Sequence, residues 1–360
     1  MDGRALAASI RLRSVTSPLR VLLVGCGGIS RAWLESLLPM PELELVGLVD
    51  LNEEAARERV VEFELAVPIE TDLESMLEKT RPDVVFNCTI PEAHHDVTLA
   101  ALSAGAHVFG EKPLADTLEQ AEAMVAAARN SGKTFAVMQN RRFDPNIRAL
   151  RTFLQRGTLG NLTEIHADFF IGAHFGGFRE VMQHVLIKDM AIHTFDAARF
   201  LTDTNPKSVY CLEWNPRGSW YERDASATAI FEMTGGQVFT YRGSWCAEGL
   251  HTPWESTWRI VGTKGTVLWN GESIRCEVVG QAGGFIREHV IVSPPTPETS
   301  AAPSWHGAAI EDFVETLLTY RKPESDAEDN LYSLKMVLGA AESAETHRVV
   351  DLTESTENVL

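Results

Sequence analysis

A glycine-rich turn directly after an apolar run constrains the fold of this chain more than any other feature of its sequence. Gly25, Gly27 and Gly28 follow the run Arg20–Val24, and a stretch with helical character begins at Ser30. In a strand–turn–helix unit of this kind, the first glycine permits the tight turn, and the second lets the backbone approach a pyrophosphate at the helix N-terminus. A glycine-rich turn also occurs in unrelated α/β domains, so the unit by itself leaves that alternative open.

The region from Arg20 to about Gln139 indicates a parallel sheet. Short apolar runs alternate there with helical segments, and the runs are Val21–Val24, Leu43–Val49, Val84–Asn87, His107–Phe109 and Thr134–Met138. Strands that alternate with helices of this length are typical of βαβ units, in which helices cover both faces of the sheet. We therefore predict an α/β Rossmann domain, a doubly wound parallel sheet, over residues 20–142, with its ligand crevice at the carboxyl ends of the strands.

Capping signals predict where two of these helices begin and where one ends. Thr71 with Glu74, and Asp116 with Glu119, have the spacing of a capping box, in which a side chain satisfies a free N–H group of the first turn. Gly132 stands where a residue in the left-handed conformation commonly ends a helix.

Asp50 bears on the choice of dinucleotide. It ends the second apolar run, close to the separation of about 20 residues at which an acidic side chain binds the ribose 2′-hydroxyl. An aspartate there repels a 2′-phosphate, and no arginine follows it until Arg57. The sequence therefore favours NAD over NADP, and the alternative for Asp50 is a polar residue that starts the next helix.

Beyond Phe143 the pattern changes to hairpins and longer helices. Apolar runs flank two glycine-containing turns, Thr234–Gly236 and Thr263–Gly265, and helical stretches are expected at Asn146–Gln155, Ile187–Leu201, Trp305–Tyr320 and Ala327–His347. We predict that residues 143–360 form an α+β domain for substrate binding and oligomerisation, with a large, mainly antiparallel open sheet. Seven of the eight tryptophans lie in this half, so we expect a homodimer or homotetramer joined through an exposed face of that sheet.

Charge and cysteine usage exclude several classes of function. Acids outnumber bases 50 to 32, a net charge of -18, which disfavours nucleic acid and anionic membranes as partners.

No apolar run approaches the roughly 18 residues that span a bilayer. Residues 1–19 lack the apolar core of a secretory signal, and we interpret them as a disordered or non-native tail. The five cysteines show no CxxC spacing, so we expect no metal site and a reducing, cytoplasmic location.

Two further groups of residues have the chemistry of an active site. The tripeptide Glu111-Lys112-Pro113 follows the fourth apolar run, which places the lysine at the carboxyl end of a parallel strand, where it can contact a substrate hydroxyl. Asp189 and His193 are four residues apart on one helix face, where a carboxylate can orient an imidazole that accepts a proton near neutral pH. A solvated lysine and a solvated helix pair remain the alternatives. Asp196 is interpreted as structural, paired with Arg199.

These motifs together resemble the glucose-fructose oxidoreductase / inositol dehydrogenase / rhizopine-catabolism (Gfo/Idh/MocA) family of NAD(P)-dependent oxidoreductases. The resemblance covers about residues 20–350 and rests on the Gly25–Ser30 turn, Asp50, Thr89-Ile90-Pro91 with His94, Glu111-Lys112-Pro113, Arg142-Phe143-Asp144-Pro145, and Asp189 with His193. Ser30 departs from the family pattern, which has Gly or Ala at that position.

The resemblance implies roles for individual residues. Lys112, Asp189 and His193 would be the catalytic trio and would also contact the substrate. The residues that would bind the cofactor are Gly25, Gly27, Gly28, Ile29, Ser30, Asp50, Thr89, Pro91, His94 and Glu111. The resemblance assigns no residue to a metal.

The substrate is expected to be a neutral polyhydroxylated ring, because no dense cluster of Arg or Lys accompanies the expected cleft residues. His174 and Arg179 follow the strand-like run Glu164–Ile171 and could hydrogen-bond a polyol. Further candidates for substrate contacts are Trp254, Trp305 and His306.

We therefore expect an enzyme that oxidises a hydroxyl of a neutral sugar or cyclitol, with hydride transfer to the nicotinamide of NAD. The resemblance leans toward aldoses, such as the branched pentose apiose, or inositol. Two alternatives stay open: a keto-sugar reductase that runs in the reverse direction, and a catalytically silent nucleotide-binding regulatory protein. The presence of all three residues Lys112, Asp189 and His193 argues against the regulatory protein.

Overall fold

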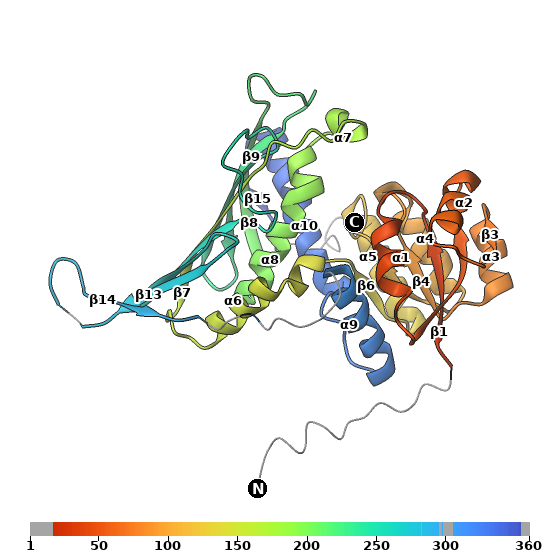
Figure 1. Ribbon diagram of the computed structural model, residues 1–360. Helices are drawn as coiled ribbons and strands as arrows, with labels where there is room; N and C mark the ends of the chain where they lie inside the picture. Colours follow the sequence, from red (N-terminus) through yellow and green to blue (C-terminus); the bar gives the residue numbers. More distant parts are fainter. Residues whose placement is uncertain (1–16, 282, 295–296, 298–304, 354–360) are drawn as a thin grey trace, which may run out of the picture. The chain divides into compact units, whose positions relative to one another are not determined.

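The computed structural model describes residues 17–281, 283–294, 297 and 305–353, which form two compact units (Figure 1). The first unit comprises the described parts of Met1–Asn140 and Ala301–Asp329, and the second comprises those of Arg141–Ser300 and Asn330–Leu360. Of the predicted N-terminal tail, residues 1–16 lie outside the described residues.

The first unit is built on a six-stranded sheet in which every pair of neighbouring strands is parallel. The order is β3-β2-β1-β4-β5-β6, the doubly wound order of dinucleotide-binding domains. The strands are β1 Leu19–Val24, β2 Leu43–Val49, β3 Ile69–Glu70, β4 Val84–Asn87, β5 His107–Gly110 and β6 Phe135–Val137. The predicted fold class of this unit is confirmed. Strand β3 was not predicted, because a strand of two residues is too short to show a periodic pattern.

Helices connect these strands, and two of their predicted start residues are wrong by one position. The helices are α1 Ser30–Leu37, α2 Glu53–Glu62, α3 Leu73–Thr80, α4 Pro91–Ser103, α5 Leu118–Ser131 and α9 Trp305–Thr319. The side chain of Asp72, not Thr71, caps α3, and that of Thr117, not Asp116, caps α5. The capping residue in each case is the one with extended backbone angles next to the first turn. Gly132 ends α5 at φ 67°, as predicted.

Helix α9 belongs to the first unit, whereas residues 143–360 were predicted to form one second domain. Phe313 of α9 is buried and stacks on Phe109 of β5, with ring centroids 4.8 Å apart. Phe109 in turn packs edge-on against Trp33 of α1 at 5.0 Å. Burial of these large aromatic surfaces holds the returning chain on the Rossmann unit, and the hydrophobic effect is the driving force.

The second unit is built on a nine-stranded sheet of order β14-β13-β12-β11-β7-β10-β9-β8-β15. Only the pair β7–β10 is parallel among the described strands of this sheet, so the predicted, mainly antiparallel sheet is confirmed. The predicted hairpins correspond to β9–β10 and β11–β12. The strands are β7 Leu162–Phe170, β8 Pro206–Trp214, β9 Ser226–Met233, β10 Val238–Ser244, β11 Thr257–Gly262, β12 Gly265–Trp269, β13 Ile274–Val279, β14 His289–Val292 and β15 Val350–Asp351.

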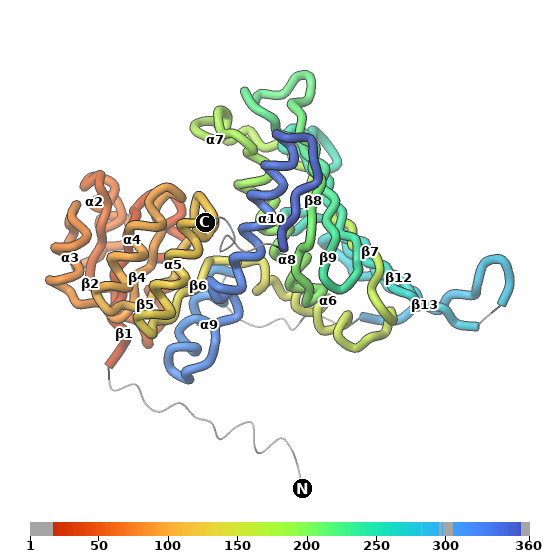
Figure 2. Tube along the Cα trace, turned by 180° about the vertical axis from the view of Figure 1, so that it is seen from behind, coloured from red at the N-terminus to blue at the C-terminus, as the bar shows by residue number. Residues whose placement is uncertain are grey.

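Helices pack on one face of this sheet and leave the other face open (Figures 1 and 2). The helical elements of this part of the chain are the 3₁₀ turn Asn140–Phe143, α6 Pro145–Gln155, α7 Phe178–Val181, the π-helical segment η2 Leu186–Ala191, α8 Ile192–Thr202 and α10 Ala327–Thr346, of which α7 has no buried residue. Side chains along β8 alternate accordingly: Val209 and Cys211 are buried, while Tyr210 and Leu212 are exposed. The sheet therefore has one face in the core and one face with exposed apolar side chains.

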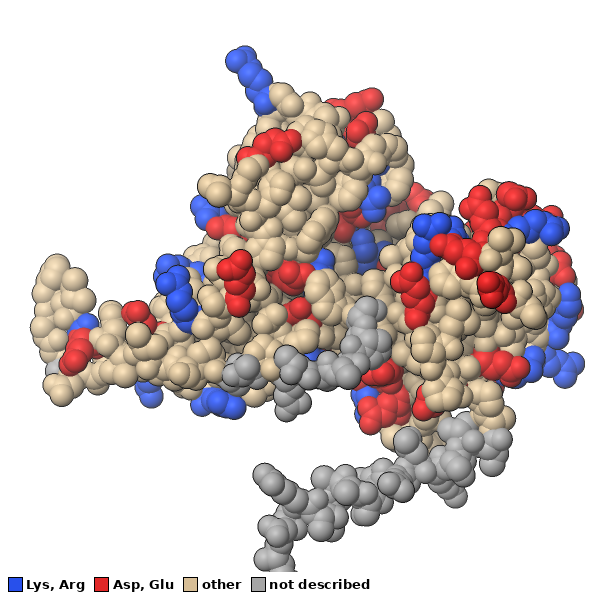
Figure 3. All heavy atoms as spheres, viewed as in Figure 1, with Lys and Arg blue, Asp and Glu red and all other residues tan. Residues whose placement is uncertain are grey.

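The surface carries both signs of charge. On the face shown in Figure 3, Lys and Arg side chains are scattered among Asp and Glu side chains. No helix among the described residues is long and apolar enough to cross a membrane.

Candidate active site

The glycine turn has the geometry that only glycine permits. Gly25 lies at φ 93°, and its N–H donates to the carbonyl oxygen of Val49 at 2.8 Å. A Cβ at this position would lie 2.5 Å from the carbonyl carbon of Cys88 at the end of β4. Contact with both neighbouring strands therefore fixes the turn at the carboxyl edge of the sheet.

The turn presents the start of α1 as a site for an anion. No side chain caps the helix at Ile29, and the hydroxyl of Ser30 donates back to the carbonyl oxygen of Gly27 at 2.6 Å. A Cβ on Gly27 or Gly28 would meet nothing within 4 Å, so there is open space above the turn. The first-turn N–H groups and this space fit the pyrophosphate of a dinucleotide.

Asp50 connects the glycine turn to the end of β2. One carboxylate oxygen accepts from the N–H of Cys26 at 2.7 Å, and the other accepts from the N–H of Asn52 at 2.8 Å. The helix that follows begins at Glu53 and is capped by Asn52, so Asp50 is not its start residue. Burial and the adjacent Asp50 carboxylate raise the pKa of the Cys26 thiol to about 12, so the turn carries a neutral thiol beside a carboxylate.

His94 holds two loops of the sheet edge together. It is buried, and its ring nitrogens lie 2.7 Å from the carbonyl oxygen of Pro113 and 3.0 Å from that of Thr89. Burial lowers the pKa of this imidazole, although the two backbone carbonyls act in the opposite direction. The resemblance implied that His94 contacts the cofactor, but both ring nitrogens face backbone oxygens. Two other predicted cofactor residues, Thr89 and Pro91, follow the end of β4, and Pro91 is the first residue of α4.

The Lys112 loop is fixed by its neighbour Glu111. The buried Glu111 carboxylate accepts from the indole N–H of Trp33 at 2.7 Å and from the N–H of Lys112 at 3.2 Å. The Nε2 atom of His306, on α9, lies 3.9 Å from the same carboxylate. Glu111 therefore orients the half-buried Lys112 at the carboxyl end of β5, and His306 contacts Glu111 at the same edge of the unit.

In the second unit, Asp189 and His193 lie on one continuous helical segment. Asp189 is in η2, and His193 is in the first turn of α8, which follows directly. The Asp189 carboxylate accepts from Nε and a terminal nitrogen of Arg179 at 2.7 and 3.3 Å. π-helical turns inside α-helices frequently occur at functional sites. The structure thus gives Asp189 a cationic partner that the sequence reading had assigned to the substrate.

A small cavity beside His193 contains an ion pair that sequence reasoning missed. Arg141, Glu255 and Trp254 line it with residues of α6 and α8, and Arg141 lies 2.5 Å from Glu255. Burial lowers the pKa of Arg141 and raises that of Glu255, while their mutual attraction opposes both shifts. The two residues are 114 positions apart, so no local pattern could indicate their pairing.

His174 lies on the surface of the second unit. Its ring stacks on Trp220 at 3.7 Å, and Nε2 lies 3.0 Å from Glu248. Its side chain is 62% exposed, so it remains accessible to a ligand.

The Arg142-Phe143-Asp144-Pro145 motif is structural. Arg142 forms two hydrogen bonds of 2.7 Å with the buried carboxylate of Asp196, and Asp144 caps α6. Asp196 also lies 3.7 Å from Arg199, the predicted partner, and accepts from Ser333 at 2.6 Å. The structural interpretation of Asp196 is therefore confirmed, with Arg142 as its main partner.

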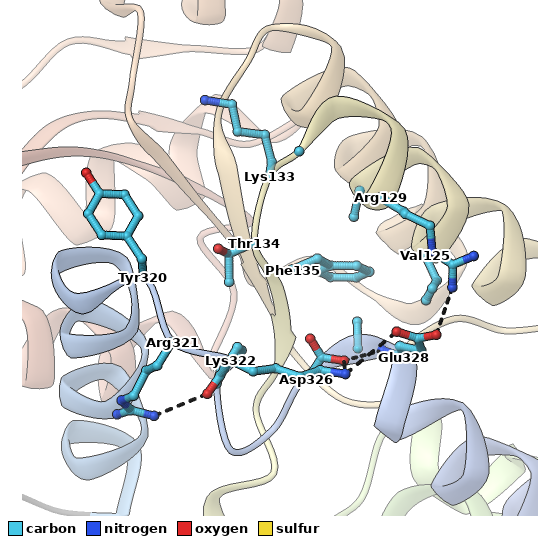
Figure 4. Close-up of a pocket in the computed structure, with 14 residues that line it drawn as sticks. Val125, Arg129, Lys133, Thr134, Phe135, Tyr320, Arg321, Lys322, Asp326 and Glu328 are labelled. Atoms are coloured by element: carbon cyan, nitrogen blue, oxygen red, sulfur yellow. Dashed lines mark hydrogen bonds and ion pairs between the residues drawn. The ribbon is translucent and has the colours of Figure 1, made fainter.

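A separate cavity of about 360 Å³ lies in the first unit, between the end of α5, the start of β6 and the segment after α9 (Figure 4). Its cations are largely paired within the unit: Arg129 with Glu328 at 2.7 Å and Lys322 with Asp326 at 3.0 Å. It opens at the amino end of β6, whereas the glycine turn lies at the carboxyl edge of the same sheet. We therefore do not assign it to the cofactor.

No group of three His, Cys, Asp or Glu side chains among the described residues could hold a metal ion. All five cysteines are free thiols.

Comparisons with known proteins agree with this geometry. Residues 19–139 match the profile described as an oxidoreductase family with an NAD-binding Rossmann fold, and residues 147–286 match the C-terminal domain of the same family. An inositol 2-dehydrogenase/D-chiro-inositol 3-dehydrogenase of Lacticaseibacillus casei is 26% identical over 85% of this chain and 86% of its own length. A D-apiose dehydrogenase of Paraburkholderia graminis is 26% identical over 92% of this chain and 88% of its own length.

A solved structure shares the fold of almost the whole chain. An oxidoreductase from Agrobacterium radiobacter, in complex with NAD⁺, L-tartaric acid and magnesium, has a TM-score of 0.80 at 22% identity and covers 93% of this chain and 98% of its own. The family profiles match parts of both units, and the glycine turn, Asp50 and strands β7 to β13 of the second sheet lie within the matched residues. The chain therefore belongs to the Gfo/Idh/MocA family of oxidoreductases, and its first unit is an NAD-binding Rossmann domain.

Proposed function

We propose that this protein is an NAD-dependent dehydrogenase that oxidises a hydroxyl of a neutral sugar or cyclitol. Bound NAD supplies the hydride acceptor. The proposal gives three side chains a role in the reaction. His193 accepts the hydroxyl proton, Lys112 stabilises the developing alkoxide charge, and Asp189 supports the imidazole.

The arrangement at the start of α8 carries this proposal. His193 lies one helical turn after Asp189, and the Asp189 carboxylate accepts a hydrogen bond of 2.7 Å from Arg179. An imidazole whose ordinary pKa is ~6.5, with an oriented carboxylate nearby, has the properties of a general base near neutral pH. A protein that only senses nucleotides needs no proton acceptor, so this arrangement favours an enzyme over a regulatory protein.

The proposed substrate class follows from the paired charges around His193. Arg141 is paired with Glu255 and Arg179 with Asp189, so neither arginine offers an uncompensated cation to a phosphate or carboxylate. Trp254 is 44% exposed beside the His193 cavity and provides an aromatic face of the kind that packs on sugar rings. Relatives named as inositol and apiose dehydrogenases act on molecules of this class.

A substrate screen tests the proposal. NAD reduction is measured by absorbance for aldoses including D-apiose, for inositols, for uronic acids and for sugar phosphates. We expect turnover with one or more free sugars or inositols. A sugar phosphate with a far higher kcat/KM than every neutral ring would contradict the substrate class. NADH oxidation by keto-sugars, without oxidation of any alcohol, would contradict the direction.

Cofactor preference should depend on Asp50. Its carboxylate lies at the glycine turn, 2.7 Å from the N–H of Cys26, where it favours a free ribose hydroxyl and repels a 2′-phosphate. Asp50→Ser is expected to weaken NAD binding and to reduce the NAD/NADP affinity ratio by at least about tenfold, the effect of 1.4 kcal/mol. Fluorescence titration with NADH and NADPH measures both affinities. Tighter binding of NADP than NAD by the wild-type protein would contradict the assignment.

Assembly should use the open face of the second sheet. Tyr210 and Ile230 are opposite each other on β8 and β9, and both are at least 40% exposed. Together with Leu212 and Trp214 they form an apolar area that a second copy of the chain can cover. We propose a homodimer or homotetramer through this face. Light scattering should give a particle mass of two or four chains of 39.7 kDa each. The substitution Ile230→Glu should lower that particle mass.

Val61→Glu places the same charge on an exposed position of α2 and serves as the control. A wild-type monomer at micromolar concentration would contradict the proposed assembly.

A further inference from the structure

The guanidinium of Arg179 is held by more than its bonds to Asp189. Its central carbon lies 4.9 Å from the ring centroid of Phe175 and 4.8 Å from that of Phe178. Contacts of this kind between a cation and an aromatic face are attractive, because the ring face carries partial negative charge. We call Phe175 and Phe178 the aromatic pair; together with Asp189, they contact Arg179 on several sides.

The local sequence explains how two nearby rings reach one guanidinium. Gly176 and Gly177 separate the rings of the aromatic pair, and both adopt positive φ, at 67° and 68°. Few residues other than glycine adopt a positive φ without strain, so this sequence permits the turn between the two rings. Arg179 follows the second ring directly, in the short helix α7.

One ring of the aromatic pair, Phe175, contacts two tryptophans of the second unit. The Phe175 ring packs edge-on against the buried Trp245 at 5.2 Å, and it lies 6.5 Å from Trp254. Trp254 also lines the cavity beside His193. The position of Arg179 is thus set by packing that is independent of Asp189, which is the requirement for a residue that orients another.

We propose that Arg179 is a positioning residue for the dehydrogenase reaction: it holds Asp189 as a paired carboxylate and thereby limits how strongly Asp189 retains a proton on His193. This inference rests on the proposed role of His193 as proton acceptor. A carboxylate without a counter-cation attracts the imidazolium proton more strongly than one whose charge a guanidinium already offsets. Arg179 therefore lowers the basicity of His193, so that the imidazolium formed in the reaction releases its proton more readily.

Two other charged groups lie near His193. Arg141 and Glu255 line the His193 cavity and are paired with each other at 2.5 Å. They come from the segment before α6 and the segment before β11, not from α7 or η2. The background Asp189→Asn separates an effect through Asp189 from a direct effect of the Arg179 charge: in that background, substitution of Arg179 should leave the His193 titration unchanged.

The test follows the titration of His193 directly. The full chain, labelled with ¹³C in its histidine rings and saturated with NAD, is titrated by NMR from acid to alkaline pH. The His193 signal is assigned by its loss in His193→Asn. We expect Arg179→Met to raise the pKa of His193 by about half a unit to one unit. Arg179→Lys keeps a cation but loses the second hydrogen bond, and should give a smaller rise.

The control is Arg129→Met, which removes an arginine paired with a glutamate at 2.7 Å in the first unit. It should leave the His193 titration unchanged. If Arg179→Met fails to fold by circular dichroism, Phe178→Leu removes one ring of the aromatic pair and should shift the titration in the same direction. Superimposable curves for the wild type and the folded variant would overturn the inference.

Kinetics separates this inference from the proposed function. With a substrate from the screen, the apparent pKa of kcat/KM should rise in Arg179→Met by the same amount as the NMR pKa. A merely structural role would lower the rate without moving the profile, and would overturn the inference. If the wild type oxidises no sugar or cyclitol, the proposed function fails, whereas the NMR titration still decides whether Arg179 acts through Asp189.

Discussion

His193→Ala is expected to lower kcat by roughly 10²–10⁴, the usual contribution of a positioned general base. Oxidation of an alcohol releases a proton as well as a hydride, and His193 is the proposed proton acceptor. The wild-type rate should rise with pH through the imidazole pKa and then level off, because only the neutral ring can accept a proton. Stopped-flow or steady-state NADH formation between pH 5 and pH 9 measures both effects.

Two controls make this result specific. NADH affinity of His193→Ala should stay close to that of the wild type, because the glycine turn and Asp50 belong to the first unit. His289→Ala removes a half-exposed histidine of β14 and should retain wild-type kcat. A His193→Ala enzyme with near-wild-type kcat and an unchanged pH profile would show that Lys112 or water takes the proton.

Lys112→Met is expected to reduce kcat/KM at least as strongly, by roughly 10³-fold or more, because one change removes alkoxide stabilisation and substrate orientation together. Methionine has a similar length but no charge, so it preserves most of the packing of the half-buried side chain. Both kcat and KM should change, since the ammonium is proposed to contact the substrate hydroxyl before and during the reaction. Initial rates over a range of substrate concentrations separate the two parameters.

Lys79→Met provides the matched control, since Lys79 is an exposed lysine paired with Glu70 at 3.0 Å in the same unit. It should have wild-type kinetics. Equal rates for Lys112→Met and the wild type would remove Lys112 from the mechanism. Partial recovery in Lys112→Arg would instead support a purely electrostatic role, because arginine keeps the charge with a different shape.

Local signals were enough to predict most of the first unit. The glycine turn and four further apolar runs predicted five of the six strands, because each depends on residues close together in sequence. The capping residues were misplaced by one position at Asp72 and Thr117. Thr71 and Asp116 have equally suitable side chains, and only the backbone conformation decides which one reaches the first turn.

The residues of the candidate site were also predicted only in part from local motifs. Lys112, Asp189 and His193 were proposed from motifs, and the structure places Lys112 at a strand end and the pair on one helical segment. The partners of these residues were not foreseen. Arg179, predicted to contact the substrate, also donates to Asp189 at 2.7 Å. His94, predicted to contact the cofactor, has its ring nitrogens next to two backbone carbonyls.

The sequence was sufficient to predict the two sheet types and the position of the glycine turn, since apolar periodicity and glycine-rich turns are local properties. The resemblance of its short motifs was sufficient to predict the family. The pairs between side chains far apart in the sequence depend on the tertiary structure, whereas the local pair Asp196–Arg199 was predicted from its spacing. Glu255 meets Arg141 across 114 positions, and Phe313 of α9 returns to stack on Phe109. Hydrogen bonds and aromatic contacts between distant segments form only when the whole chain has buried its apolar surface, so no window of sequence contains them.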